Sequence, residues 1–123
     1  MSITLKRGEI YRIVFPYISD ERHKDKPQEK FVLILQGGAR FDRHKKVAGL
    51  IITSKDYHSE DITVKLDVGI VQALPLVSYV LCFQPHTFDK KLFEGRQPCG
   101  QLPFEKMNEI DEKLYIGLCM GLE

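Results

Sequence analysis

Short apolar segments, separated by polar stretches, occupy the first four-fifths of the chain and predict β-strands. Residues Glu9–Phe15 are rich in aromatic and β-branched side chains and end at a proline, which is typical of a strand. The continuous apolar runs Phe31–Gln36, Val47–Ser54 and Val77–Phe83 are typical of strands that are buried on both faces. We expect the last of these strands to continue toward Phe88.

The segment Ile62–Asp67 has a strict two-residue period, because its apolar and polar residues alternate. Such alternation indicates a strand with one buried and one solvated face. We therefore expect inward-facing side chains at Ile62, Val64 and Leu66, and outward-facing side chains at Thr63, Lys65 and Asp67.

The C-terminal part of the chain has a helical period instead. Pro103 suits the first turn of this helix, Glu105 suits its positive end, and Gly117 and Gly121 suit a fraying C-terminus. Strands followed by one helix predict a mainly β (α+β) fold, a small, curved antiparallel sheet or barrel with the helix packed on it, in a single domain of residues 1–123. One apolar stripe on the helix is formed by Phe104, Met107, Ile110, Leu114 and Leu118.

Two polar segments are predicted to be connectors. In Ser19–Lys30, eight of the twelve residues are charged, so this segment cannot pack and we expect a long mobile loop. The segment Arg40–Lys46 (RFDRHKK) is a basic connector between two apolar strands. Its cations and those of the long loop would bind phosphate groups if they lie on one face of the molecule.

The charge balance does not indicate a polyanionic or membrane partner by itself, because 18 basic residues stand against 17 acidic residues among 123. The charges are unevenly placed, however. Residues 1–102 carry sixteen basic and twelve acidic side chains, whereas residues 103–123 carry two and five. A mildly basic body is therefore followed by an acidic C-terminal segment.

Sequence motifs for metals and cofactors are absent. The three cysteines form no CxxC pair, the four histidines have no metal-ligand spacing, and neither GxGxxG nor GxxxxGK[ST] occurs, so we expect no metal and no cofactor. Reduced cysteines suit the cytoplasm. The N-terminus lacks the apolar core of a signal peptide, and the stretch Val68–Phe83 falls short of a membrane span, so we expect no membrane partner.

Four short motifs follow one another along the chain: KRGEIY at 6–11, VLILQ at 32–36, TS at 53–54 and SYVLCFQPHTFDKKL at 78–92. In this order the sequence resembles the MazF/PemK family, the toxin component of type II toxin–antitoxin systems. That family has an RGE/D-I-W/Y element, an RP-V-L-V-L strand, a T-S at a strand end and an S-V-x-x-x-D-Q-x-R-T-I-D segment. The resemblance covers about residues 6–120.

The resemblance implies a small SH3-like antiparallel β-barrel with a C-terminal helix, which forms a homodimer. It implies a metal-independent endoribonuclease, an mRNA interferase, that cleaves single-stranded RNA at short sequences. A groove of the dimer binds the RNA, and a segment of a cognate antitoxin protein blocks this groove. The ribose 2′-OH would attack the adjacent phosphodiester, which requires a base, an acid and donors to the phosphorane oxygens.

The family's site residues carry over only in part. The threonine of the T-S motif corresponds to Thr53, whose hydroxyl would donate to a phosphate oxygen. The arginine before the proline of RP aligns with Lys30, which keeps the charge but lacks the planar guanidinium. Lys26, which precedes a proline, is the other candidate for this position. The family's acid–base positions in the next motif are occupied by Leu81 and Phe83, which have no proton to donate.

Two hypotheses follow from these departures. In the first, the chain cleaves RNA with Thr53, Lys30 and a histidine, His23 or His86, as the titrating group, and we then expect these residues to converge on one concave surface. In the second, the chain is a catalytically degenerate barrel that binds nucleic acid, an antitoxin or another protein. The residues expected to bind RNA are Lys24, Lys26, Arg40, Arg43, Lys45, Lys46, Ser54 and Gln84.

Overall fold

The computed structural model describes residues 4–15, 28–56 and 58–119, which form one sheet and a C-terminal helix. The strands are β1 (Glu9–Phe15), β2 (Gln28–Ile34), β3 (Lys46–Thr53), β4 (Thr63–Leu66), β5 (Ser78–Leu81), β6 (His86–Asp89) and β7 (Gly100–Gln101). The helices are the short 3-10 helices η2 (Ala39–Phe41) and η3 (Lys90–Phe93) and the α-helix α1 (Phe104–Cys119). No helix in these ranges is long and apolar enough to cross a bilayer.

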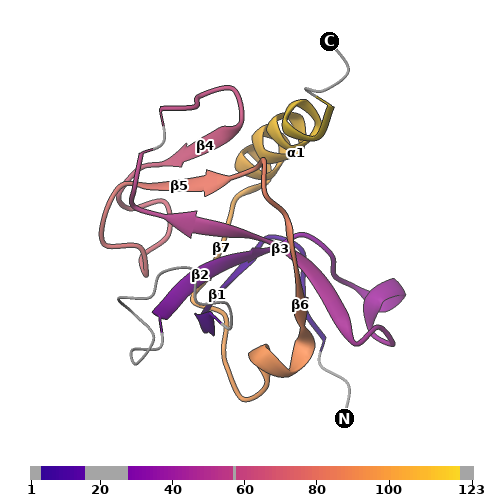
Figure 1. Cartoon of the computed structure of the whole chain (residues 1–123). Helices are drawn as coiled ribbons and strands as arrows, with labels where there is room; N and C mark the ends of the chain where they lie inside the picture. Colours follow the sequence, from indigo (N-terminus) through magenta and orange to yellow (C-terminus); the bar gives the residue numbers. More distant parts are fainter. Residues whose placement is uncertain (1–3, 16–27, 57, 120–123) are drawn as a thin grey trace.

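The seven-stranded sheet has the order β4-β5-β3-β2-β1-β7, and β6 pairs with β3 outside this order. Strand β3 is its centre, because β2 pairs along one edge of β3 and both β5 and β6 pair along the other. Figure 1 shows β4 and β5 beside α1 at one end of β3, with β6 near its other end. All these pairings are antiparallel, so the predicted fold, a small curved antiparallel sheet with a packed helix, is confirmed.

The curved sheet has a hydrophobic core on each face. One core, which we call the helix-side core, contains Leu33, Leu50 and Ile52 from the sheet together with Met107 and Ile110 from α1. The core on the opposite face contains residues of β1, β2 and β3 with two aromatic rings that follow β5. The prediction that β2 and β3 are buried on both faces is therefore confirmed.

Strand β1 carries a tyrosine that lies in the second core. The Tyr11 ring packs edge-to-face against Phe93, with ring centroids 5.3 Å apart, and its hydroxyl donates to Glu9 Oε1 at 3.4 Å. Burial, together with the neighbouring Glu9 carboxylate, raises the pKa of Tyr11 to about 12. The phenol is therefore held in its neutral form.

Helix α1 is where the sequence predicts, but only the middle of its apolar stripe is covered. Met107 and Ile110 are buried and Leu114 is partly buried, whereas Phe104 is 78% and Leu118 is 61% exposed, because the sheet covers only the middle of the helix. Gly117 lies in the last turn of the helix, which ends at Cys119, and Gly121 lies outside the described residues.

Gly117 also marks a close approach between α1 and the turn after β5. A Cβ added at Gly117 would lie 3.2 Å from Phe83 Cα and 3.3 Å from the carbonyl oxygen of Cys82. A contact this tight favours the smallest residue. The role of Gly117 is therefore to let the last turn of the helix lie against the turn after β5.

The strand predictions hold with three corrections. The predicted loop is wrong at its last three residues, because Gln28–Lys30 belong to β2, and its residues 19–27 lie outside the described part of the chain. Thr63 is buried rather than solvated, since its hydroxyl donates to the Ser59 carbonyl at 2.9 Å. The strand predicted to continue toward Phe88 ends at Leu81, where a turn leads into the separate strand β6.

The beginning and the end of the described chain are held together. Strand β7 closes the outer edge of β1, the Leu102 amide donates to the Gly8 carbonyl at 3.0 Å, and the Arg7 guanidinium forms an ion pair with Asp111. Gly37 packs on the same N-terminal segment, and a Cβ at Gly37 would lie 2.5 Å from backbone atoms of residues 5 and 7. This position therefore requires glycine.

Candidate active site at the ends of β2 and β3

Thr53 and Lys30 lie on neighbouring strand ends. Strand β2 pairs with β3 through Phe31 and Ile52, and one further step of this antiparallel register places Lys30 opposite Thr53. On the other side of β3, Thr53 is opposite Tyr79 of β5. Thr53 and Lys30 are both half-buried, and the Thr53 hydroxyl oxygen accepts from the Lys55 amide at 3.2 Å. A cation and a hydroxyl are thus neighbours at the edge of the core, as the sequence hypothesis requires.

A pocket of about 200 Å³ lies beside these strand ends. It is smaller than the roughly 300–1,000 Å³ of sites for drug-sized ligands, so it suits a small flat group. Because side chains alternate along a strand, those of Phe31 and Ile52 lie on the helix-side face, and those of Lys30 and Thr53 lie on the opposite face. The pocket is lined by Glu29, Lys30, Phe31, Ile52, Thr53, Ser54, Leu74, Pro75, Leu76 and Ser78.

An ion pair fixes the acidic residue of this pocket. The Glu29 carboxylate contacts Arg12 Nε at 2.5 Å, and the Arg12 guanidinium lies 5.9 Å from the centre of the Phe31 ring. The backbone carbonyl of Arg12 also accepts from Arg96 at 2.8 Å. The Glu29 charge is therefore balanced locally by Arg12, and Lys30 is the cation that lines the pocket beside Thr53.

The structure does not bring His86 beside Thr53. His86 begins β6 and is opposite Gly49, which lies four residues before Thr53 on β3, or about 13 Å along the strand. Its ring lies 5.9 Å from the Phe88 ring. A general acid or base must reach the reacting atoms directly or through one water molecule, which this separation does not allow within one chain.

The predicted site residues of the long polar segment cannot be placed. His23, Lys24 and Lys26 lie outside the described residues. Among the remaining predicted residues, Ser54 follows Thr53 and lines the pocket, whereas Gln84 lies in the exposed turn between β5 and β6.

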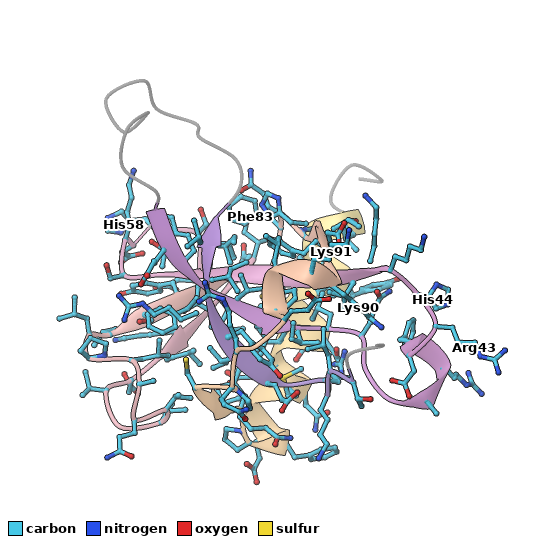
Figure 2. The ribbon with its side chains drawn as sticks, turned by 90° about the horizontal axis from the view of Figure 1, so that it is seen from below. Arg43, His44, His58, Phe83, Lys90 and Lys91 are labelled. Atoms are coloured by element: carbon cyan, nitrogen blue, oxygen red, sulfur yellow. The ribbon has the colours of Figure 1, made fainter. Side chains whose placement is uncertain are left out.

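The other predicted RNA-binding cations gather at the opposite end of β3, which we call the basic end. Lys46, the first residue of β3, lies seven residues, or about 23 Å, from Thr53. Figure 2 shows the connector that carries Arg43 and His44 on the side of the molecule where η3 carries Lys90 and Lys91. We define the basic end as Arg40, Arg43, His44, Lys45, Lys46, Lys90 and Lys91.

One buried lysine holds the two halves of the basic end together. The Lys90 ammonium donates to the carbonyl of Phe41 in η2, and the Lys90 amide donates to the Lys45 carbonyl at 2.9 Å. Only 7% of Lys90 is exposed, so its role is to join the connector to η3. The arginines and the other lysines of the basic end remain exposed at its surface.

The residues that surround Thr53 were not predicted from the sequence. Tyr79, Lys65 and Glu29 lie in strands; Tyr79 is part of the motif at 78–92 but does not occupy one of its acid–base positions, and Lys65 and Glu29 belong to no motif. Their proximity to Thr53 depends on which residues of different strands lie opposite each other. One signal in the sequence was available: Thr53 and Tyr79 both lie near the ends of predicted apolar strands, where a polar side chain can reach the edge of the sheet.

The geometry defines a class of protein: a small half-barrel that presents a cation and a hydroxyl at adjacent strand ends and a second basic surface along the same strand. A comparison with known protein families identifies the family to which this chain belongs. The family described as "PemK-like, MazF-like toxin of type II toxin-antitoxin system" matches residues 6–118, so the chain belongs to this family. The resemblance found in the sequence motifs is thereby confirmed.

Solved structures show the same fold. An endoribonuclease in complex with its cognate antitoxin from a mycobacterial species is 22% identical, with a TM-score of 0.67 and 95% of each chain covered. A MazE–MazF complex from Deinococcus radiodurans is 16% identical, with a TM-score of 0.71, 97% of this chain and 98% of that chain covered. The Mycobacterium tuberculosis toxin MazF-mt6 is 16% identical, with a TM-score of 0.68, and the match covers 89% of this chain and 94% of that one.

A curated relative matches over one segment only. The chain is 28% identical over 119 residues to the DNA-directed RNA polymerase subunit beta of Ureaplasma urealyticum. The match covers 88% of this chain but spans only 8% of the length of that protein. The likeness therefore concerns a short part of the polymerase subunit.

Proposed function

We propose that this toxin is a metal-independent endoribonuclease that cleaves single-stranded RNA at the ends of β2 and β3. The observation that carries the proposal is the cross-strand placement of Lys30 and Thr53 beside a small pocket, in a chain of the MazF-like toxin family. Structural neighbours named as endoribonucleases support it. In this chain a lysine takes the place of the family's arginine.

In the proposed reaction, the ribose 2′-oxygen attacks the adjacent phosphorus and the 5′-oxygen leaves, which produces a 2′,3′-cyclic phosphate. The Lys30 ammonium and the Thr53 hydroxyl donate hydrogen bonds to the phosphoryl oxygens, where negative charge develops. A base removes the 2′-proton, and an acid returns a proton to the leaving 5′-oxygen. We assign the titrating role to His23 and place His86 with the RNA-binding residues, because His86 lies about 13 Å along β3 from Thr53.

We propose that the RNA on one side of the cleaved bond extends along β3 to the basic end. Its exposed cations, Arg40, Arg43, Lys45 and Lys46, would contact phosphates regardless of sequence. Gln84 lies between the two ends, in the turn that follows β5, and Ser54 lies at the pocket. Both side chains offer hydrogen bonds to the RNA.

The proposal includes two protein partners and a compartment. A cognate antitoxin would cover the RNA surface, as two neighbours are solved as toxin–antitoxin complexes. A second copy of the chain would form a homodimer, and the exposed Phe104, Tyr115 and Leu118 of α1 offer apolar surface for one of these contacts. The compartment is the cytoplasm, where the target RNA is present.

The test is cleavage of a long single-stranded RNA by the purified protein with EDTA present. Thr53→Val and Lys30→Ala should each reduce the rate by about 100-fold or more, the usual effect of removing one donor to the transition state. Lys30→Arg keeps the charge and should retain most of the activity. Thr87→Val and Lys6→Ala change exposed residues of the same types away from the site and should match the parent protein.

Cleavage that survives both Thr53→Val and Lys30→Ala would exclude this site. If the parent protein binds RNA but leaves it intact, the ribonuclease proposal fails and the binding-module hypothesis replaces it. Cleavage that stops only when EDTA is added would exclude the metal-independent reaction.

A further inference from the structure

A continuous row of polar side chains crosses the sheet at the level of Thr53. The registers place Lys30 opposite Thr53, Thr53 opposite Tyr79, and Tyr79 opposite Lys65 of β4. Directly opposite residues of antiparallel strands lie on the same face, with Cβ atoms about 4.5–5.5 Å apart. Four strands, β2, β3, β5 and β4, therefore each contribute one polar residue to what we call the cross-strand row.

The neighbouring positions confirm which face carries the row. The residues adjacent to the row on these strands, one on each strand, lie on the opposite face and belong to or pack on the helix-side core: Phe31, Ile52, Val80 and Val64. Since side chains alternate along strands, the four residues of the row face away from α1.

The row is accessible to a ligand. Lys30, Thr53 and Tyr79 are half-buried, and the Lys65 side chain is 60% exposed. The Lys65 ammonium lies 4.0 Å from an Asp67 carboxylate oxygen, and an exposed ion pair of this length contributes little. Within the described ranges, the Tyr79 ring contacts no other aromatic ring. Its two cross-strand neighbours are a hydroxyl and a cation, and the ring is only half-buried.

The dimensions and the chemistry of the row suit a single-stranded nucleic acid. Strands lie about 4.8 Å apart, so the backbones at Lys30 and Lys65 are separated by about 14 Å. The row thus has a cation at each end, with a hydroxyl and an aromatic ring between them. Proteins that bind single-stranded RNA on a sheet stack bases on aromatic rings and hold phosphates with cations.

We propose that RNA crosses the strands along this row, with one base stacked on Tyr79 and a phosphate bound by Lys65, on the β4 side of the cleaved bond. This inference rests on the proposed ribonuclease function and adds a second cation and a stacking platform to it. Neither Tyr79 nor Lys65 takes part in bond cleavage. Both residues position the strand so that the phosphate beside Thr53 is held from two sides.

The test measures binding alone, so that it is separate from cleavage. The probe is a fluorescent single-stranded RNA of mixed sequence with 2′-O-methyl riboses, which cannot be cut by a 2′-hydroxyl mechanism. Tyr79→Leu should raise Kd about ten-fold, within the range found for loss of one stacked base, whereas Tyr79→Phe keeps the ring and should stay within two-fold. Circular dichroism spectra and melting curves check that both variants fold.

The contribution of Lys65 is measured by salt dependence. Lys65→Gln should lower the slope of log K against log salt by about 0.7, the value for one phosphate contact on a single strand. The matched variant Lys6→Gln removes an exposed lysine away from the row and should leave the slope unchanged.

Three results would overturn the inference: parental affinity for Tyr79→Leu, equal weakening by Tyr79→Phe and Tyr79→Leu, or an unchanged salt slope for Lys65→Gln. Failure of the ribonuclease proposal gives a different pattern. In that case the parent protein leaves ordinary RNA uncut, while the methylated probe still binds with the dependence on Tyr79 and Lys65 described above.

Discussion

Replacing Leu66 by alanine tests the packing that supports the β4 end of the cross-strand row. Leu66 is 1% exposed and belongs to the helix-side core. The change removes three carbon atoms, worth about 0.8 kcal/mol each, or about 2.4 kcal/mol of transfer free energy. The cavity left behind adds to this, so we expect a loss of about 3–4 kcal/mol in the free energy of unfolding.

The matched control is Val68→Ala, two residues further along the chain. Val68 is 62% exposed, so its truncation should change the unfolding free energy by less than about 0.5 kcal/mol. Urea unfolding followed by circular dichroism measures both variants at one fixed protein concentration, because the stability of a dimer depends on concentration. For 123 residues, a loss of 3 kcal/mol corresponds to a fall in Tm of about 12 °C.

A loss below about 1 kcal/mol for Leu66→Ala, or equal losses for the two variants, would refute the packing of β4 against the helix-side core. A changed m-value would also matter, since it indicates a change in the surface exposed on unfolding rather than a simple loss of contacts. The prediction therefore requires a shifted midpoint with an unchanged slope.

Three further predictions concern single residues. Gly37→Ala should lower stability by about 2 kcal/mol, because the added Cβ would lie 2.5 Å from backbone atoms of residues 5 and 7; an unchanged urea midpoint would contradict this contact. Burial raises the pKa of Cys82 to about 12, so at pH 8 iodoacetamide should label Cys99 and spare Cys82; equal labelling in peptide mass maps would contradict it. The raised pKa of Tyr11 means that the folded state binds the phenolic proton more tightly than the unfolded state. Its contribution to stability is complete below pH 10 and is lost as the pH rises toward 12, and Tyr11→Phe should remove this part of the decline, which urea unfolding at pH 9 and 11 measures.

The strands of the half-barrel were predictable because burial leaves a periodic record in the sequence. The segment Glu9–Phe15 was predicted with the bounds that the structure shows, and the strand predicted at 47–54 lies at Lys46–Thr53. Strand β6 could not be separated from β5, because its position depends on a turn that carries the chain from one part of β3 to another. No local sequence pattern indicates that the chain pairs with β3 a second time after this turn.

Local hydrogen bonds and the extent of the sheet explain the other misplaced side chains. Thr63 is polar and was expected in solvent, but a bond to the Ser59 carbonyl satisfies its hydroxyl in a buried place. Phe104 and Leu118 continue the helical stripe in the sequence, yet the sheet does not reach either end of α1. Periodicity predicts the face of a helix and not how much of that face is covered.

The candidate site was predictable only where a family motif marks it. Thr53 and Lys30 were proposed from motif positions, and the sheet places them on adjacent strands. Tyr79 and Lys65 could not be added, since the register between distant strands is fixed by turns and by the whole buried face. The same limit explains His86, which lies within the motif at 78–92 but pairs with a different part of β3 than Tyr79 does.

The closure of β1 by β7 also determines when the molecule can be completed during its synthesis. Arg7 and Asp111, which form an ion pair, are 104 residues apart. Pairings between distant residues form late, since a long loop must close first. The sheet therefore cannot be finished until nearly the whole chain has left the ribosome. A chain that stops before residue 100 keeps β1 as an open edge, which exposes it to aggregation. An unfinished toxin is thus expected to be cleared by proteases instead of acting as a weak version of the complete protein.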